Sequence, residues 1–562
     1  MRRLACLAVL LPCLQAVPAA AEVQVLLADT IRTGDPQQPL ATALAWDTDT
    51  GRVLAVGARE AMLQLYPQAP RIDVGDATVV PGLIDAHGHL TSLGNALAQA
   101  DLTGTRSRAE VVQRLQAFEK NLAPGEWLLG HGWDQNDWQD GTDFPGVADL
   151  DAAFPQRPVY LERIDGHAGW ANSAALRIAE QAGKSLSGDW QPAGGRIVRD
   201  AAGKPGGVLV DNATQLVSAL IPLPDEAARS KRLQAALHEA VRNGLTGVHD
   251  MGVSSTELAL MRQLADQGKL PLRIDAYADG NQQALADLCA HGLYRHPGGR
   301  LQMRGVKLYM DGALGSRGAA MLEDYSDDPH NRGLLVTSPE DFEAAVRKAD
   351  GCHVQVATHA IGDRGNRIVL DTYARVLGDN AAGDHRWRVE HAQVVALEDI
   401  PRFAQLHLVA SMQPTHATSD MGWAEQRVGP ERIKGAYAWQ RYLQQGTQLA
   451  LGSDFPVEQV DPRLGLYAAV TRQDRDGQPP GGWQPGQRLS PAEALRGFTR
   501  DAAWAGHDEA EVGSLQRGLR ADFVVLDRDP LAPEAGRLDT LKVLSTWVDG
   551  VPVYKAGEQA AQ

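Results

Sequence analysis

The feature that most constrains the fold is a long alternation of short apolar segments with helical segments between Pro81 and about Asp501. The apolar segments have strand length, and helical periodicity fills most intervals, for example over residues 226–242 and 338–350. Eight such units predict an α/β fold, a (β/α)₈ TIM barrel, whose chemistry lies at the carboxyl ends of the strands. The predicted strands are residues 82–87, 245–250, 272–277, 305–309, 353–358, 386–390, 406–411 and 448–453.

The chain is too long for a barrel alone, since 562 residues are enough for several domains. The interval between the first and second predicted strands far exceeds an ordinary loop, which predicts an inserted subdomain over about residues 105–225, above the barrel mouth. Residues 22–80 and 506–562 consist of short strands divided by turn glycines. They predict a small β-sandwich domain built from both termini, flanking a barrel domain over residues 81–505.

Composition and charge exclude several function classes. Hydrophobic residues at 44% and charged residues at 22% are typical of a folded protein rather than a disordered or fibrous chain. Lys and Arg number 54 against 70 Asp and Glu, so the net charge is −16. This charge disfavours binding to nucleic acid or to anionic lipid. A small molecule is the expected partner, and a homodimer is compatible with the sequence.

The first 21 residues have the pattern of a cleaved secretory signal. Two early arginines precede an apolar run that is too short to span a bilayer, and three alanines ending at Ala21 follow it. A lipoprotein anchor is the alternative, but Cys6 leaves too little apolar sequence before it, and Pro12 precedes Cys13 where a small residue is expected. We expect export to the periplasm or the medium, with cleavage near Ala21 and no membrane insertion afterwards.

Cleavage at this point leaves only Cys289 and Cys352, too few for a disulfide framework. A single bridge in an oxidising compartment is one interpretation. Two buried free thiols are the favoured interpretation, because free cysteine is among the most frequently buried residue types.

Polar side chains occur at the ends of five predicted strands. Two histidines stand two residues apart at the end of the first strand, so on an extended segment they point to the same side. Lys307 faces away from Val306 and Leu308 on the fourth strand, and His391 is expected to share a face with Val389 and Trp387. The candidate set is His87, His89, Lys307, His359, His391 and Asp454.

Each of these residues has an ordinary structural interpretation when it is taken alone. A bare His-x-His pair often arises by chance, and a histidine at a strand end is more often a hydrogen-bonded core or surface residue. Lys307 alone suggests an ion pair with a carboxylate such as that of Asp311, and Asp454 alone suggests the start of a turn. Their convergence at strand ends favours a metal cluster, because imidazole and carboxylate are ordinary Zn²⁺ ligands.

The motifs that carry this set resemble the amidohydrolase superfamily, and within it the N-substituted formamide deformylase or YtcJ-like branch, amidohydrolase family 3. The resemblance extends over nearly the whole chain after the signal, and none of the six candidate positions departs from the family pattern. The motifs are PGLIDAHGH at 81–89, GHAGWANS at 166–173, GVLVDNA at 207–213, KLYMDGALGSR at 307–317, THAIGDR at 358–364, VEHAQ at 389–393, MQPTH at 412–416 and LGSDFPV at 451–457.

The resemblance implies two divalent metal ions at the barrel mouth. His87 and His89 are expected to bind one ion and His359 and His391 the other, while Asp454 completes the first site and takes protons. Zn²⁺ is the default from the ligand types, although Mn²⁺, Fe²⁺ and Co²⁺ suit similar sites.

The resemblance also assigns a role to Lys307, whose position is carboxylated in binuclear members of the superfamily. An ammonium is a donor only, whereas a CO₂-derived carbamate offers anionic oxygens that bridge two ions. His416 is the best candidate for an oxyanion or substrate contact, with a backbone-bonded loop histidine as the equally weighted alternative. Further candidates for the pocket wall are Trp133, Asp134, His167, Asp311 and Arg317. Trp127, Trp133, Trp138 and Trp170 suit equally well a small core inside the insertion.

The expected reaction is hydrolysis of a non-peptide C–N bond, in a linear amide or an N-acyl or N-formyl amine, by a metal-activated hydroxide. Opening of a cyclic amide, ester or lactone hydrolysis and deamination are alternatives on the same metals, since the fold does not choose between them. Lys307 argues against a one-metal deaminase, because such a site needs no bridging ligand. The presence of all six candidate residues disfavours a non-enzymatic binding protein.

Overall fold

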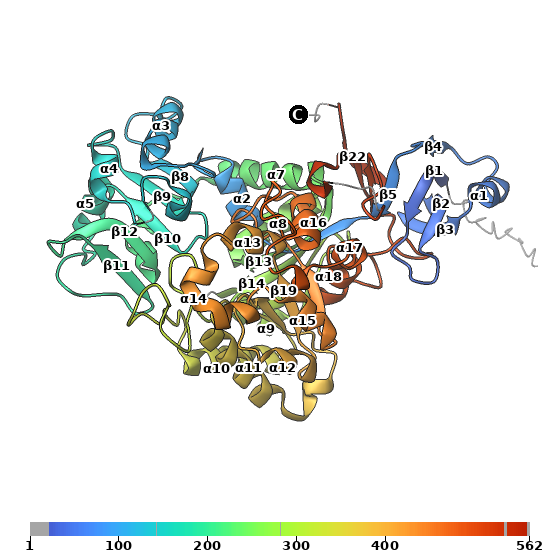
Figure 1. Cartoon of the computed structure of the whole chain (residues 1–562). Helices are drawn as coiled ribbons and strands as arrows, with labels where there is room; N and C mark the ends of the chain where they lie inside the picture. Colours follow the sequence, from blue (N-terminus) through green and yellow to red (C-terminus); the bar gives the residue numbers. More distant parts are fainter. Residues whose placement is uncertain (1–21, 142, 281–282, 533–536, 559–562) are drawn as a thin grey trace, which may run out of the picture.

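The protein is described by a computed structural model over residues 22–141, 143–280, 283–532 and 537–558, which form three β-sheets with their helices (Figure 1). In Figure 1 the insertion lies at the left, the barrel at the centre and the N-terminal strands at the right. The predicted export signal, residues 1–21, lies outside the described residues. None of the helices in the described ranges combines the length and the apolar character that a membrane span requires.

The barrel strands run parallel in the order β20-β19-β18-β17-β16-β14-β13-β6. The sheet nearly closes on itself, because Gly88 of β6 forms a parallel bridge with Phe455, which follows β20. A TIM-barrel-like α/β fold is therefore confirmed, and every observed strand overlaps a predicted one. The strands are β6 (Leu83–Gly88), β13 (Leu245–Val253), β14 (Arg273–Asp279), β16 (Leu301–Tyr309), β17 (Gln355–Ala360), β18 (Arg388–His391), β19 (Val409–Met412) and β20 (Gln448–Leu451).

The barrel helices begin where the sequence supplies caps. The Asp225 carboxylate accepts the amide of Ala228 at the start of α7 (Glu226–Arg242), and Ser338 caps α10 (Pro339–Gly351), which has proline at its first position. Both predicted helices agree with these bounds to within one residue. The other helices of this part are α2 (Leu90–Ala96), α8 (Ser255–Asp266), α9 (Gln283–His291), α11 (Asp363–Leu377), α12 (Ile400–Gln405), α13 (Pro414–Asp420), α14 (Ala424–Arg432), α15 (Trp439–Gln444), α16 (Pro462–Thr471), α17 (Pro491–Gly497) and α18 (Arg500–Ala505).

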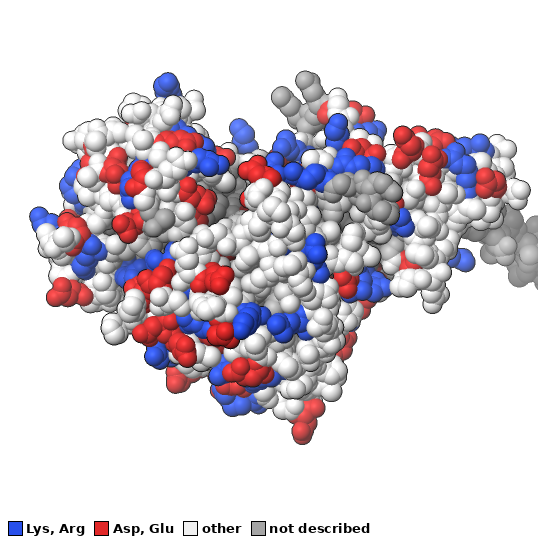
Figure 2. Space-filling view, viewed as in Figure 1, with Lys and Arg blue, Asp and Glu red and all other residues white. Residues whose placement is uncertain are grey.

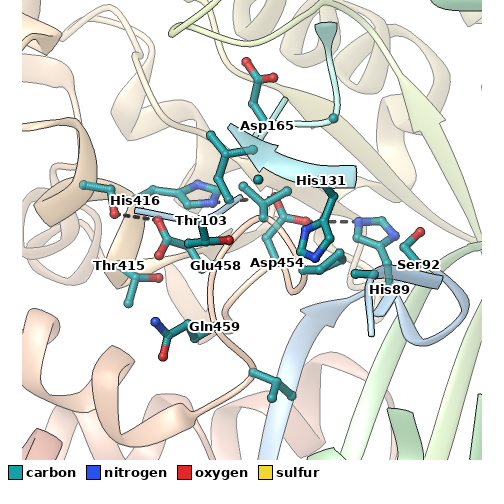
Figure 3. Close-up of a pocket in the computed structure, with 18 of the residues that line it drawn as sticks. His89, Ser92, Thr103, His131, Asp165, Thr415, His416, Asp454, Glu458 and Gln459 are labelled. Atoms are coloured by element: carbon teal, nitrogen blue, oxygen red, sulfur yellow. Dashed lines mark hydrogen bonds and ion pairs between the residues drawn. The ribbon is translucent and has the colours of Figure 1, made fainter. Parts of the chain in front are cut away.

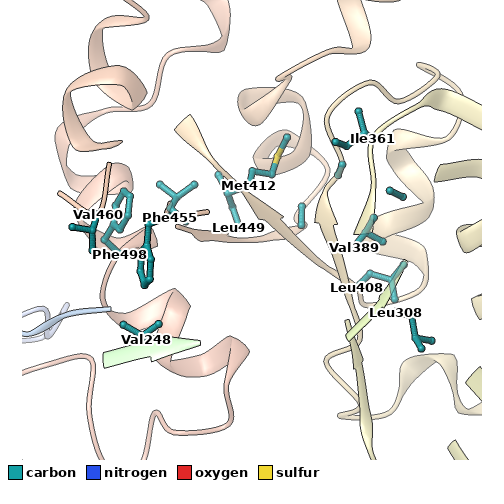
Figure 4. Close-up of a cluster of buried hydrophobic side chains, with 14 of the residues drawn as sticks. Val248, Leu308, Ile361, Val389, Leu408, Met412, Leu449, Phe455, Val460 and Phe498 are labelled. Carbon is teal, nitrogen blue, oxygen red and sulfur yellow. The ribbon is translucent and has the colours of Figure 1, made fainter. Parts of the chain in front are cut away.

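The main hydrophobic core lies between the barrel strands and these helices (Figure 4). Val306 and Leu308 of β16 belong to this core, together with Val389 of β18. Lys307 lies between Val306 and Leu308 in the sequence but is buried on the opposite, inner side of the sheet. Each apolar side chain of this size contributes about 1.5–3 kcal/mol by its burial, which fixes the strand register and so turns Lys307 inward.

Between β6 and β13 the chain forms a second, six-stranded sheet in the order β11-β12-β10-β9-β8-β7. Trp133, Trp138 and Trp170 form its core with ring centroids 5.8–6.1 Å apart, as the core interpretation of the tryptophans predicts. The elements are β7 (Ala100–Asp101), α3 (Arg108–Glu119), β8 (Leu128–Trp133), α4 (Val147–Asp151), β9 (Val159–Arg163), β10 (Ala168–Ala171), α5 (Ser173–Gln181), β11 (Gly195–Arg199), β12 (Pro205–Asp211) and α6 (Gln215–Ser218).

Strands from both termini form the third sheet, in the order β23-β22-β21-β5-β1-β2-β3 with β4 beside β1. The sheet coils, so that Trp46 of β2 contacts Phe523 of β21 and Trp547 of β22. A core shared by both termini is thus present, while the division into two stacked layers that defines a sandwich stays a prediction. The elements are β1 (Val23–Arg32), β2 (Leu40–Asp47), β3 (Arg52–Gly57), α1 (Arg59–Leu65), β4 (Arg71–Asp73), β5 (Thr78–Pro81), β21 (Phe523–Leu526), β22 (Val543–Val548) and β23 (Val551–Lys555).

The favoured interpretation of the two cysteines is wrong, because Cys289 and Cys352 form a disulfide, with Cα atoms 5.3 Å apart. Cys289 lies in α9 and Cys352 caps the end of α10. The two residues are 63 positions apart in the sequence, and only the docking of helices around the barrel brings them together. The spacing of the two cysteines in the sequence does not predict this contact, so the statistical preference for buried free thiols led to a wrong prediction.

Candidate metal centre

The carboxyl end of β6 supplies the first pair of candidate ligands. Nε2 of His89 lies 3.0 Å from Oδ1 of Asp454, and Nε2 of His87 lies 3.4 Å from the same oxygen. The two histidines therefore point to the same side of the strand, as their spacing predicts. Nδ1 of His89 contacts the main-chain oxygen of Met251 at 2.8 Å, which leaves Nε2 facing the site.

Asp454 follows β20 with a left-handed backbone, at φ 64°. Its amide donates to the main-chain oxygen of His87, and Ser453 donates through its hydroxyl to Asp85, so the ends of β20 and β6 are held together. Burial opposes the charge on the Asp454 carboxylate, but the nearby imidazoles of His87 and His89 outweigh it and lower the pKa. Asp454 is thus ionised at neutral pH, as a carboxylate ligand must be.

A buried carboxylate that the sequence analysis did not assign lies behind His87. Oε2 of Glu390 is 2.5 Å from Nδ1 of His87, and both side chains are fully buried. Arg388 binds both carboxylate oxygens of Glu390, so this carboxylate is an acceptor only and Nδ1 of His87 donates. The contact leaves Nε2 of His87 as the ligand atom, in the manner of the carboxylates that orient metal-binding histidines. In the sequence, Glu390 appeared only as the residue before His391 in the motif VEHAQ.

Lys307 points into the barrel, where Nζ lies 3.2 Å from Nε2 of His87. Burial lowers the pKa of Lys307 to about 8. Asp311 is not its partner, because the Asp311 carboxylate accepts the amides of Ala320, Ile361 and Gly362 instead. Lys307 forms no ion pair within the described part of the chain, so the predicted alternative of a simple lysine–carboxylate pair is wrong for Asp311.

His359 and His391 come from the ends of β17 and β18, and their ring centroids are 4.6 Å apart. His391 departs from the predicted alternation, since Val389 lies in the outer core while His391 packs 4.8 Å from His87 inside the barrel. The reason is its left-handed backbone, at φ 71°, which turns the side chain inward. Gln413, a second residue that sequence reasoning missed, contacts Nδ1 of His391 through Oε1 at 2.9 Å.

His416 lies in the first turn of α13, and its Nε2 is 3.6 Å from Oδ2 of Asp454. This nitrogen is buried and has no hydrogen-bond partner in the described part of the chain. The interpretation of His416 as a loop histidine bonded to the backbone is therefore not supported. Two triads hold their ligand atoms within 4.8 Å of one another, and they are His87, His89 and Asp454, and His391, His416 and Asp454.

The donor set fits divalent metal ions. Imidazole must be neutral to bind a metal, and burial together with neighbouring cationic groups lowers the pKa of His87, His359 and His391 well below the ordinary value. The Nε2 atom of His416 is a buried donor or acceptor that lacks a partner, as expected of a site built for a ligand. Neutral imidazoles and an ionised carboxylate are the ligand types that hold Zn²⁺ and related ions.

An open cleft of about 1650 Å³ is lined by His89, Lys307, His359, His391, His416 and Asp454, whereas His87 is fully buried. The barrel supplies one wall and the insertion supplies the other, with His131 and His89 close to Asp454 (Figure 3). Of the predicted wall residues, Asp134 and His167 line the cleft. The other three do not, because Trp133 is in the insertion core, Asp311 binds backbone amides, and Arg317 pairs with Asp327. Acidic and basic side chains are interspersed on the face in Figure 2.

A family model described as "Amidohydrolase family" matches residues 71–554. The chain is 35% identical to Protein LONG AFTER FAR-RED 3 of Arabidopsis thaliana, covering 93% of this chain and 90% of the relative. It is 33% identical to the protein named "Putative amidohydrolase YtcJ" of Bacillus subtilis, covering 90% and 95% of the two chains. It is 30% identical to the N-substituted formamide deformylase of Arthrobacter pascens, covering 93% and 97%.

Among solved structures, the fold is similar to that of an uncharacterized metal-dependent hydrolase from Pyrococcus horikoshii OT3, with a TM-score of 0.73 and 28% identity. The match covers 92% of this chain and 99% of that one. The family model, the relatives and the histidine and aspartate cluster agree with the predicted family. The chain belongs to the amidohydrolase family, in the family 3 branch, and is a metal-dependent hydrolase.

Proposed function

We propose that this hydrolase cleaves a linear, non-peptide C–N bond, as in an N-formyl or N-acyl amine. The observation that carries the proposal is the convergence of imidazoles, Asp454 and Lys307 around Nε2 of His87 at the barrel mouth. The similarity to an N-substituted formamide deformylase over nearly the full length of both chains supports the choice of a linear amide. The open cleft above the cluster leaves room for an extended substrate.

Two ions are the proposed cofactor, with Zn²⁺ as the expected metal. His87, His89 and Asp454 would hold one ion, and His359 and His391 the other. Divalent ions at such a site would polarise a carbonyl and lower the pKa of a bound water toward about 7.

Lys307 is the proposed bridging residue, in its carboxylated form. Loss of one proton from the ammonium frees the Nζ lone pair, which forms a bond to the carbon of CO₂ with loss of a second proton, so that a cationic donor becomes an anionic group with two oxygen ligands. Two observations support this role, namely the 3.2 Å contact of Nζ with His87 and the absence of an ion pair for Lys307 in the described part of the chain. An ammonium beside two divalent ions would suffer like-charge repulsion and desolvation.

Asp454 is the proposed proton carrier. It is ionised, and Oδ2 lies 3.6 Å from Nε2 of His416 and accepts no hydrogen bond from the residues that the structure describes, so it is free to accept a proton from the attacking water. The same oxygen can return the proton to the departing nitrogen, because an amine leaves poorly without one. His416 lies beside this oxygen and is the proposed contact for the substrate oxygen.

The experiment that tests the proposed function is a substrate panel with metal-loaded enzyme, scored by release of the amine. N-formyl and N-acetyl alkylamines represent the proposed class, while a lactam, a lactone and an aminopyrimidine represent the alternatives. Turnover of the linear amides at least about 100-fold above the others, equivalent to about 2.7 kcal/mol, is expected. Preferential turnover of a ring substrate would refute the proposal that linear amides are the substrates, and would leave the family assignment unchanged.

We further propose that the chain is exported after removal of residues 1–21. The disulfide between Cys289 and Cys352 supports this location, since disulfides persist in oxidising compartments and are rare in the cytosol. N-terminal sequencing of protein from the periplasm or medium is expected to begin near Glu22. A full-length chain retained in the cytosol would contradict it.

A further inference from the structure

Acidic side chains outnumber basic ones along the wall of the cleft. Most of the basic side chains in this wall are already paired with carboxylates. Arg163 contacts the carboxylates of Asp134 and Asp165, and similar contacts occupy other wall arginines. The wall therefore holds an excess of negative charge next to the proposed reaction centre.

Several carboxylates of this wall, among them those of Asp137, Glu162 and Glu458, form no ion pair with a basic side chain in the described structure. Glu458 follows the candidate metal ligand Asp454 by four residues. Burial, with the negative charges of Asp454 and Asp137 as further causes, raises its pKa to about 7. Glu458 therefore stands in the wall without a compensating cation.

Glu458 is held against one face of α13. The Ser419 hydroxyl donates to Oε1 of Glu458 at 2.7 Å. Thr415 lies four residues before Ser419, so both side chains are on the same face of the helix. Figure 3 shows Thr415, His416 and Glu458 gathered on one side of Asp454. The Glu458 subsite, defined as Thr415, Ser419 and Glu458, thus adjoins the candidate metal ligands.

Thr415 supplies an independent sign of a ligand. Thr415 is only 6% exposed and lines the cleft, and its Oγ1 is buried without a hydrogen-bond partner among the residues that the structure describes. Buried hydroxyl groups are almost always hydrogen-bonded, so an unpaired one at a cleft wall indicates a missing partner. The Glu458 carboxylate beside α13 and the Thr415 hydroxyl on the helix match a group that carries several donors and a positive charge.

Resting on the proposed function, we propose that the substrate is an N-acyl or N-formyl diamine, whose free ammonium group binds in the Glu458 subsite while its amide lies at the metal centre. An ammonium has three N–H donors and no acceptor, so the Glu458 carboxylate and Thr415 Oγ1 both accept from it. Charge-assisted hydrogen bonds of this kind are about twice as strong as neutral ones. A substrate carboxylate would be repelled by the same wall.

The spacer between the two nitrogens is a few methylene groups, since His416, which contacts Asp454, is the direct neighbour of Thr415. Hydrolysis breaks the C–N bond of the amide. The water oxygen stays with the acyl carbon as the carboxylate, and the departing nitrogen takes a proton and leaves as part of the free diamine. No further reactant is needed.

The kinetic test compares N-formyl-1,3-diaminopropane, N-formyl-1,4-diaminobutane and N-formyl-1,5-diaminopentane with N-alkylformamides of equal length that end in a methyl group. At least one cationic substrate is expected to have a kcat/KM about tenfold or more above its neutral match, a gain of the size that charge-assisted hydrogen bonds give. Equal or lower kcat/KM for all three cationic substrates, with the neutral formamides hydrolysed, would overturn the inference and leave the proposed function standing.

Glu458→Gln removes the charge and keeps the shape, and Thr415→Val removes the acceptor oxygen. Both variants are expected to lower the ratio of kcat/KM for a cationic substrate to kcat/KM for its neutral match. In Glu458→Gln this ratio should fall toward one. The matched control is Asp476→Asn, which removes one charge from the outer rim of the same cleft and should keep the ratio. Retention of the wild-type ratio in Glu458→Gln would overturn the inference.

A binding measurement decides the inference independently of catalysis. Calorimetric titration with 1,4-diaminobutane, with 1-butylamine as the reference, is expected to show at least about tenfold weaker binding of the diamine to Glu458→Gln than to wild type. If no formamide is cleaved, the proposed function fails, and loss of diamine binding in this variant still supports the subsite. Equal diamine binding to wild type and Glu458→Gln would refute the subsite.

Discussion

Oε2 of Glu390 and Nδ1 of His87 lie 2.5 Å apart in the closed interior of the barrel. The first belongs to β18 and the second to β6, strands that are not neighbours in the sheet. The contact fixes the tautomer of His87, and with it the nitrogen that faces Lys307 and Asp454. A carboxylate at this distance also increases the basicity of the imidazole as a ligand.

Glu390→Gln is therefore expected to lower the affinity for metal and kcat/KM by about 10–100-fold, the cost seen when a partner of this kind is lost. Competition with a chelator and elemental analysis of the folded fraction measure the effect. Ser411→Ala is the matched control, because it removes a different partner of Arg388 and leaves the contact between Glu390 and His87 in place. Unchanged metal affinity in Glu390→Gln would show that the contact is structural only.

Lys307→Ala is expected to lose metal and activity together, because the proposed bridge between the two ions is lost. Metal content by elemental analysis and amine release are measured in parallel. Addition of short-chain carboxylates should restore part of both, since they supply the missing oxygens. Two ions and near-normal turnover in Lys307→Ala would disprove the carbamate. A bare amine at Lys307 in good electron density of the wild type would disprove it as well.

Wild-type protein prepared without chelator is expected to contain about two ions per chain. His391→Ala should lose much of one ion with little change in Tm, because ligands at strand ends support function more than packing. Val389→Ala is the contrasting variant. It should lower stability by about 0.5–3 kcal/mol and keep both ions, because Val389 belongs to the outer core. One ion or fewer in the wild type would count against a binuclear site.

Replacement of both Cys289 and Cys352 by serine is expected to lower the free energy of unfolding by about 2–4 kcal/mol, because the bridge closes a long loop in the unfolded chain. Denaturant titration of the oxidised wild type and the double variant measures this cost. Thiol labelling under denaturing, non-reducing conditions should detect no free thiol in exported wild type. Two labelled thiols there would contradict the disulfide.

Asp549 joins the terminal sheet to the barrel through Arg273 at 2.6 Å, with Arg300 and Arg520 beside it. Burial opposes its charge, but the three guanidinium groups outweigh burial and lower its pKa below the ordinary value of 3.8. A lowered pKa gives stability that is present above about pH 3.8 and is lost as the pH falls through the folded-state pKa.

Asp549→Asn should therefore cost about 1–3 kcal/mol at pH 7, less than a fully buried pair because Asp549 is partly exposed. Asparagine tolerates the left-handed backbone at this position, so the charge alone is tested. Urea titrations should show the difference from wild type shrinking between pH 5 and pH 3. A difference independent of pH would assign the cost to packing instead of charge.

The barrel and most of the candidate site could be predicted from the sequence, because both depend on local patterns. Eight apolar segments separated by helical periodicity fix the order of strands, and the carboxyl ends of parallel strands meet at one mouth. The alternation around Lys307 fixes its inward direction in the same way, since Val306 and Leu308 must be buried outside. These are short-range constraints, and the amino-acid order carries them directly.

Only the tertiary structure decided the contacts between distant segments and the departures of single residues from regular geometry. Glu390 meets His87 across the barrel interior, and Cys289 meets Cys352 between two helices; no local pattern records either distance. His391 turns inward because one backbone angle is left-handed, which strand alternation cannot anticipate. Such features depend on how the whole core packs, so they follow from the closed fold and not from the order of neighbouring residues.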